Sequence, residues 1–225
     1  MSEVFVIPSG PLRVNSLVVS VDGKNAFVVD PAGCRFSRDS SEIVDFLKSR
    51  NLNCFAVVLT HTHFDHISGI REVRMAFPEC KIAVHKAEAE ELNGKPGKMN
   101  ESILDFFGFS DFLETVSIQP EYDTLLKDGD NLSLLLPSAA PELKDNLSQW
   151  KIIHTPGHSP GSICIYNENE KLMLSGDTLF KNSCGRTDMY GGNETLIMEN
   201  LDMLDKLMPS GTKVYPGHDE VFTIR

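Results

Sequence analysis

The stretch His61-Thr62-His63-Phe64-Asp65-His66 places four potential metal ligands within six residues. It directly follows an apolar run at residues 55–59, which is typical of a buried strand. A helix would turn residues two positions apart to different sides, whereas a loop leaving a strand can point all of these side chains at one site. Imidazole and carboxylate ligands suit zinc, iron or manganese better than calcium or magnesium. The stretch therefore predicts a metal site at the end of a strand.

Three later segments repeat one arrangement, a short apolar run followed by a ligand-type residue in a glycine-bearing turn. Residues 150–158 end in His158, residues 171–177 end in Asp177, and residues 214–218 end in His218. Glycine beside a ligand lets the backbone turn tightly and approach a metal. Four predicted strands thus deliver ligands from their C-terminal ends, and functional loops held by rigid strands are typical of an active site.

The candidate ligands divide into two groups of three, with one carboxylate left to connect them. One metal could be held by His61, His63 and His158, a second by Asp65, His66 and His218, and both by a bridging Asp177. Each metal would keep an open position for water, which distinguishes a catalytic site from a structural one. We assign a catalytic as well as a ligand role to the two carboxylates, Asp65 and Asp177.

Other polar residues near these motifs leave alternatives open. His154 competes with His158, but its place inside a predicted strand favours packing, and His85 is interpreted as a surface residue. Cys184 lies in sequence between Asp177 and Arg186, but no nearby base marks it as a nucleophile. Arg186 could bind a carboxylate of the substrate through two hydrogen bonds, or it could form a structural salt bridge.

Composition excludes several functional classes. The chain has 225 residues, of which 41% are hydrophobic and 24% charged, as in ordinary globular proteins. A net charge of −11 argues against nucleic acid as the main partner. There is no apolar run of the ~20 residues that a membrane span needs, and no signal-peptide pattern at the start. Five scattered cysteines without a C-x-x-C pair indicate reduced thiols and a cytoplasmic location.

Hydrophobic patterning predicts a mixture of strands and helices on either side of a less regular region. The predicted strands are residues 4–7, 14–21, 26–30, 55–59, 81–84, 151–154, 162–166, 171–175 and 213–215, and the predicted helices are 40–49, 67–77 and 195–208. Residues 86–148 form an excursion with a loop at 93–98 and an aromatic-rich stretch at 101–113. We interpret it as helical packing against the body, with a lid or a homodimer patch beside the active site as the alternative.

Taken in order, these motifs resemble the metallo-β-lactamase superfamily. The pattern H-x-H-x-D-H is present at residues 61–66, and the segments of His158, Asp177 and His218 follow it. The resemblance covers nearly the whole chain apart from the excursion at 86–148. It implies an α/β (α+β) fold, a four-layer αββα sandwich with its metals at one edge between two sheets, formed by a single domain over residues 1–225.

Within that superfamily, residues 155–162, 175–180 and 215–218 are most similar to the glyoxalase II group, which hydrolyses S-D-lactoylglutathione. The resemblance is to a short form, without the C-terminal helical domain that helps full-length members bind glutathione. A further departure is Asp188, where an aromatic residue is usual. The resemblance implies a thioester hydrolase that uses a metal-bridging hydroxide and two divalent metal ions, zinc in preference to iron or manganese. It also implies a small-molecule substrate, with a glutathione derivative as the first candidate.

Two alternatives come from other functional classes. Residues 184–188 are also similar to the persulfide dioxygenases, which use a single iron; His61, His158 and Asp177 would then hold that iron. The other alternative is a metal-binding protein without catalytic activity. A complete second ligand set favours two metals, and open coordination positions favour catalysis.

Overall fold

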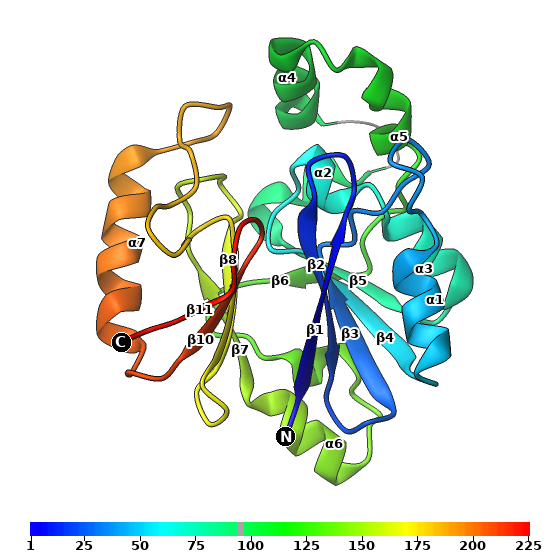
Figure 1. Cartoon of the computed structure of the whole chain (residues 1–225), viewed down its shortest axis with the longest axis vertical. Coiled ribbons are helices and arrows are strands. Elements are labelled where there is room, and N and C mark those ends of the chain that lie inside the picture. Colours follow the sequence, from blue (N-terminus) through cyan, green and yellow to red (C-terminus); the bar gives the residue numbers. More distant parts are fainter. Residues whose placement is uncertain (94–96) are drawn as a thin grey trace.

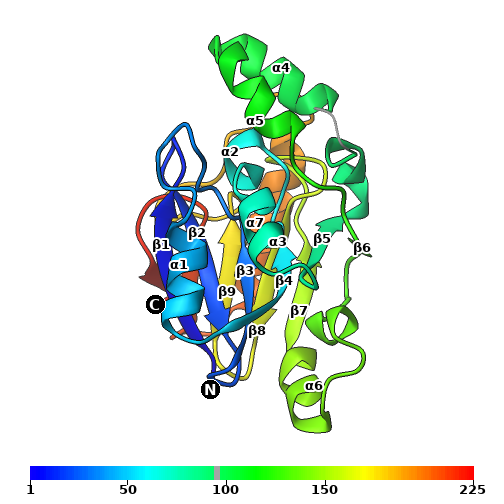
Figure 2. The ribbon, with the colours of Figure 1, turned by 90° about the vertical axis from the view of Figure 1, so that its right-hand side faces the viewer.

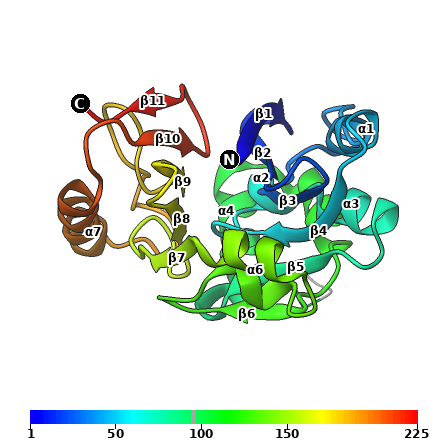
Figure 3. The same ribbon diagram turned by 90° about the horizontal axis from the view of Figure 1, so that it is seen from below.

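The structure is a computed structural model that describes residues 1–93 and 97–225. Two β-sheets face each other, and helices cover the outer face of each (Figure 1). Seen from below, the order across the molecule is α7, the second sheet, the first sheet, and then α1 with α3 (Figure 3). This arrangement confirms the predicted four-layer αββα sandwich.

Among the residues that the structure describes, the first sheet contains six strands in sequence order. Its first three strands pair in antiparallel fashion, and the remaining pairs are parallel. The strands are β1 (Glu3–Ser9), β2 (Val14–Ser20), β3 (Asn25–Val29), β4 (Asn53–Val58), β5 (Lys81–His85) and β6 (Thr124–Leu126).

The second sheet, within the described ranges, contains five strands in the order β11-β10-β9-β8-β7. The strands are β7 (Trp150–His154), β8 (Ile163–Asn167), β9 (Leu172–Gly176), β10 (Lys213–Pro216) and β11 (Phe222–Thr223). Because β8 is antiparallel to both neighbours and β10 is parallel to β9, the strands β7, β9 and β10 all end at the same edge.

The helices cover the sheets and one open end of the sandwich. They are α1 (Glu42–Ser49), α2 (Phe64–Ile67), α3 (Ile70–Ala76), α4 (Lys98–Phe107), α5 (Leu113–Ser117), α6 (Pro141–Ser148) and α7 (Glu194–Leu207), with 3-10 turns η1 (Lys86–Glu91), η2 (Ser110–Phe112) and η3 (Leu132–Leu135). The pair α4 and α5 stands above the strand ends (Figure 2). No helix in the described ranges is long and apolar enough to cross a membrane.

Side chains of the central strands are buried on both faces, which explains their continuous apolar sequences. Along β3, Phe27 packs into the layer between the sheets, whereas Val28 packs under α1 and α3. Trp150 of β7 meets Phe27 edge to face, with ring centroids 5.4 Å apart. Such strands cannot shift register by one residue without exchanging the contents of two core layers, so the positions of their ends are well determined.

The structure differs from the local predictions in two respects. The helix predicted at 67–77 is divided into α2 and α3 at Gly69, whose N–H donates to the carbonyl of Pro31 at 2.7 Å. A Cβ at this position would lie 2.7 Å from the carbonyl oxygen of Gly33, so the close approach requires glycine. The short strands β6 and β11 were not predicted. The predicted loop at 93–98 lies partly outside the described residues.

Candidate metal centre

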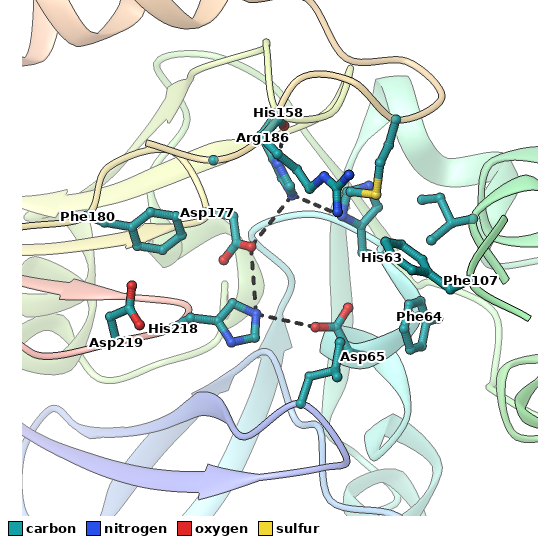
Figure 4. Close-up of a pocket in the computed structure, with 14 residues that line it drawn as sticks. His63, Phe64, Asp65, Phe107, His158, Asp177, Phe180, Arg186, His218 and Asp219 are labelled. Atoms are coloured by element: carbon teal, nitrogen blue, oxygen red, sulfur yellow. Dashed lines mark hydrogen bonds and ion pairs between the residues drawn. The ribbon is translucent and has the colours of Figure 1, made fainter. Parts of the chain in front are cut away.

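The seven predicted ligands all lie at one edge of the sandwich. Four of them follow β4: His61, His63, and the α2 residues Asp65 and His66. The other three, His158, Asp177 and His218, follow β7, β9 and β10, respectively. Figure 4 shows the Asp177 side chain between His158 and His218, with Asp65 and His63 facing them from the other sheet. The topology therefore gathers residues that are up to 157 positions apart, from His61 to His218.

His61, His63 and His158 form the first group, with ligand atoms all within 4.8 Å of one another. The Nε2 of His158 is 2.9 Å from the Nδ1 of His63. All three residues are buried. The two ring nitrogens face each other closely and away from solvent. Ligands of a single cation are arranged in this way.

Asp65, His66 and His218 form the second group within the same distance limit. The Nε2 of His218 is 3.3 Å from an Asp65 carboxylate oxygen and 3.3 Å from the Nε2 of His66. Two ligands held ~2.1 Å from one ion in tetrahedral geometry lie ~3.4 Å apart. The spacing in this group matches that value.

Asp177 connects the two groups. Its Oδ2 lies 3.6 Å from the Nε2 of His158 in the first group and 3.7 Å from the Nε2 of His218 in the second. Its Oδ1 lies 3.5 Å from the Nε2 of His66. One carboxylate thus reaches ligands of both groups, which is the geometry that a bridging ligand requires.

Three polar atoms of this ligand set are buried without a hydrogen-bond partner in the described part of the chain. They are His61 Nε2, His63 Nε2 and Asp177 Oδ1. Buried polar atoms are nearly always paired, so unpaired nitrogen and oxygen acceptors beside two compact ligand groups need an explanation. Divalent metal ions would provide one for His61 Nε2 and Asp177 Oδ1, and the residues fit them. His63 faces His158 through its Nδ1 instead.

Asp30, which the sequence interpretation missed, supports both groups from behind. One of its carboxylate oxygens is 2.9 Å from the Nδ1 of His66, and the other accepts the backbone N–H of Thr60 at 2.8 Å. The Thr60 hydroxyl also contacts Asp30 and lies 3.0 Å from the Nδ1 of His61. Although Asp30, His61 and His66 are close enough to hold an ion, these contacts occupy Asp30 and the Nδ1 atoms. We therefore assign Asp30 a positioning role.

A second buried carboxylate, Glu88 of η1, joins two ligand loops. It accepts the backbone N–H and the hydroxyl of Thr62, each at 2.7 Å, and the backbone N–H of Gly161 at 2.6 Å. Asn100 of α4 donates to the carbonyl of Thr62 at 2.7 Å. The region predicted as an excursion therefore also holds the His61–His66 loop in place.

The two ligand groups differ in charge. Burial lowers the pKa of His61 and His63 well below the usual range, and neighbouring histidines add to the effect, so both rings are neutral and can offer a lone pair. At His66, burial opposes protonation, but Asp65 and Asp177 outweigh it and raise the pKa to about 10. Burial would raise the pKa of Asp65, but His66 and His218 hold it well below its usual value. The second group therefore pairs an ionised carboxylate with a protonated His66, and a cation that binds there would replace that proton.

Two glycines permit this close packing. A Cβ at Gly217 would lie 2.8 Å from the ring of His66 and nearer still to Asp177, and a Cβ at Gly185 would lie 2.8 Å from the Nδ1 of His158. The Nδ1 of His158 instead bonds the carbonyl oxygen of Arg186 at 2.8 Å. The backbone of the 184–188 loop thus fixes the orientation of that histidine.

The remaining residues considered from the sequence lie around the centre. The Arg186 side chain pairs with Asp188 through contacts of 2.7 and 2.8 Å, which is the salt-bridge alternative. His85 is buried, so its interpretation as a surface residue was wrong. Its ring stacks on the ring of His154, with ring centroids 3.9 Å apart. The two rings meet because His85 ends β5 of the first sheet and His154 ends β7 of the second. Cys184 is half-buried and unpaired with any other cysteine.

Comparisons with known proteins agree with this geometry. The model of the "Metallo-beta-lactamase superfamily" matches residues 9–218. A probable metallo-hydrolase of Bacillus subtilis, YqgX, is 29% identical over 94% of this chain and 88% of its own length. A hydroxyacylglutathione hydrolase of Pelagibacter ubique is 28% identical over 96% of this chain and 71% of its own length. The crystal structure of the BLEG-1 B3 metallo-β-lactamase matches with a TM-score of 0.77 and 31% identity, covering 99% of this chain and 94% of that one.

Proposed function

The chain belongs to the metallo-β-lactamase superfamily of metal-dependent hydrolases, and on this basis we propose that it cleaves a thioester with two divalent metal ions, zinc in preference to iron or manganese. The observation that carries the proposal is the position of Asp177 between two complete three-residue groups. Similarity to hydroxyacylglutathione hydrolases supports the choice of a thioester.

The reaction adds water to the thioester carbonyl and breaks the carbon–sulfur bond. The sulfur leaves with the bonding electron pair, and the products are a carboxylic acid and a thiol. When bound, two divalent cations would lower the pKa of a water ligand toward ~7 and polarise the carbonyl. His61, His63 and His158 would hold one cation, Asp65, His66 and His218 the other, and Asp177 both.

The protein's own groups favour a thiolate leaving group. As metal ligands, Asp65 and Asp177 would both be ionised, so Asp65 can accept a hydrogen bond from the attacking water but neither carboxylate can act as a general acid. A thiol has a pKa of ~8.5, so the thiolate needs little protonation as it leaves. An alkoxide or amine would need a proton donor, which neither carboxylate of the ligand set supplies.

Elemental analysis combined with turnover tests the proposal. Protein loaded with zinc should contain two metal ions per chain and hydrolyse S-D-lactoylglutathione or an uncharged thioester, and His218→Ala should lose about half of the metal. The mono-iron dioxygenase would instead contain one iron, consume oxygen with glutathione persulfide, and keep its metal in His218→Ala. That result would overturn the proposal. Full metal content without cleavage of either thioester would favour the non-catalytic alternative.

A further inference from the structure

The cleft above the metal centre has walls of mainly apolar character. Its volume is about 290 Å³, and beyond the ligands it is lined by Leu12, Phe64, Ile103, Phe107, Phe180 and Met189. Figure 4 shows Phe180 on one side of the metal centre and Phe64 with Phe107 on the other. A substrate held at the centre therefore lies against aromatic and aliphatic side chains from several separate elements.

The cleft has one lining cation in the described part of the chain, Arg186, and its charge is already compensated. The Nε and Nη2 atoms of Arg186 donate to the two carboxylate oxygens of Asp188. The guanidinium also lies over the ring of Phe107, 5.3 Å from the centroid. This arrangement uses the paired N–H geometry that would otherwise bind a substrate carboxylate.

Other charges near the rim do not provide a free cation for an anionic substrate. Asp219 is exposed and lines the cleft. Lys181, close to Phe180 in sequence, lies 2.8 Å from Glu220. The net charge of −11 repels anions at long range. Away from the metal centre, a carboxylate bound against the walls of the cleft would lose water without gaining a partner, which is unfavourable.

We propose that the part of the substrate that occupies this cleft is uncharged and apolar, and that Phe107 is a specificity-determining residue for it. The inference rests on the proposed function for the identity of the bond cleaved, but not for the character of the cleft. It predicts that thioesters with an aliphatic or aromatic group and without carboxylates are preferred over glutathione thioesters.

Binding of thioethers, which cannot be hydrolysed, tests the cleft separately from catalysis. S-hexyl-N-acetylcysteamine and S-hexylglutathione share their alkyl chain, but only the second carries carboxylates. We expect calorimetry on the zinc-loaded protein to show at least tenfold tighter binding of the neutral compound. A fully buried methylene contributes about fourfold in affinity, so S-hexyl-N-acetylcysteamine should bind about thirtyfold tighter than its S-methyl analogue if half of the chain is buried. Equal or tighter binding of the glutathione compound would overturn the inference.

A matched pair of phenylalanines locates the binding surface. Phe107 lines the cleft, whereas the neighbouring Phe106 does not and is 73% exposed. Phe107→Ala should weaken binding of S-hexyl-N-acetylcysteamine about tenfold, and Phe106→Ala should change it less than twofold. Equal effects of the two substitutions would contradict a specific role for Phe107.

A substitution at Asp188 tests the role of charge and leaves the apolar wall unchanged. Asp188→Asn would free the Arg186 guanidinium, so the affinity for S-hexylglutathione should rise about fivefold while that for the neutral compound stays the same. If Asp188→Asn has no effect and Arg186→Ala weakens binding of S-hexylglutathione, Arg186 already serves anionic substrates and the inference is wrong.

The two proposals fail in different ways. If the neutral thioether binds as expected but no thioester is cleaved by protein containing two metal ions, the hydrolase proposal is wrong and the inference about the cleft stands. If S-D-lactoylglutathione is cleaved and S-hexylglutathione binds more tightly than the neutral compound, the hydrolase proposal stands and the inference about the cleft is wrong.

Discussion

Three histidines of the metal centre are held from behind by polar partners, whereas the aromatic side chains in and after α4, above them, are substantially exposed to solvent. The Nδ1 atoms of His61, His66 and His158 meet the Thr60 hydroxyl, the Asp30 carboxylate and the Arg186 carbonyl. By contrast, three aromatic residues in and after α4 are substantially exposed: Phe106 at 73%, Phe107 at 39% and Phe109 at 45%. The centre is therefore fixed by the fold, whereas Phe107, the exposed aromatic residue that lines the cleft, can change at little cost in stability.

This contrast separates the type of reaction from the choice of substrate. A metal ligand must stay within a few tenths of an ångström of its position, and such precision needs a supporting layer of contacts. A hydrophobic wall needs only the right volume and polarity. Substitutions in the centre should consequently abolish function, whereas substitutions in the wall should redirect it.

The largest effect is expected at Asp177. Asp177→Ala removes the carboxylate proposed to bridge the two groups, so both metals should be lost and turnover should fall on the order of 10³-fold. His158→Ala and His66→Ala serve as comparisons, because each removes a ligand of one group only. Elemental analysis and thioester hydrolysis measure the outcome. Retention of both metals and of activity in Asp177→Ala would show that it does not bridge.

A smaller effect should follow from Asp30, which supports the centre without belonging to either proposed ligand group. Asp30→Asn keeps an oxygen for the backbone N–H of Thr60 but presents an amide group where the Nδ1–H of His66 needs an acceptor. We expect metal affinity of the second group to fall about 10- to 100-fold, measured by competition with a chelator.

Asp39→Asn is the matched control for Asp30→Asn. Asp39 also accepts backbone N–H groups, from Gly10 and Cys34, but does so away from the ligands. It should therefore alter stability without changing metal affinity. Equal metal affinities for Asp30→Asn and the wild type would mean that the centre needs no support from behind.

The sequence predicted the centre better than its support or its wall, for a physical reason. The ligands come after apolar strands, and His158, Asp177 and His218 each directly follow a glycine, which is a local pattern. Asp30 and Glu88 act on partners that are tens of residues away in sequence, so their roles depend on tertiary packing, although Asp30 also ends a predicted strand. The aromatic content at 101–113 was visible, but which ring faces the cleft depends on how α4 packs. His85 was misjudged because its partner, His154, comes from the other sheet.

Glu88 tests whether the excursion belongs to the fixed region or to the wall. Glu88→Gln replaces one acceptor oxygen with a donor, so at least one N–H of Thr62 or Gly161 would lose its partner. We expect the free energy of unfolding to fall by about 2 kcal/mol, measured by denaturant titration. Glu90→Gln, at an exposed neighbour in η1, should change it by less than about 0.5 kcal/mol. If the two variants unfold alike, η1 is only attached to the centre and does not stabilise it.

The smallest effect is expected at Arg186, where the two regions meet in one residue. Its backbone carbonyl orients His158, whereas its side chain is exposed and paired with Asp188. Arg186→Ala should therefore leave metal content unchanged and alter the KM for an uncharged thioester less than about threefold. Gly185→Ala, one residue earlier, should instead lower the metal content, because its Cβ would lie 2.8 Å from the Nδ1 of His158.

The sequence alone allows Arg186 to bind a substrate carboxylate, in which case Arg186→Ala would raise the KM for S-D-lactoylglutathione much more than the KM for the uncharged thioester. Measuring both KM values and the metal content of both variants thus decides whether this loop acts through its backbone or through its charge.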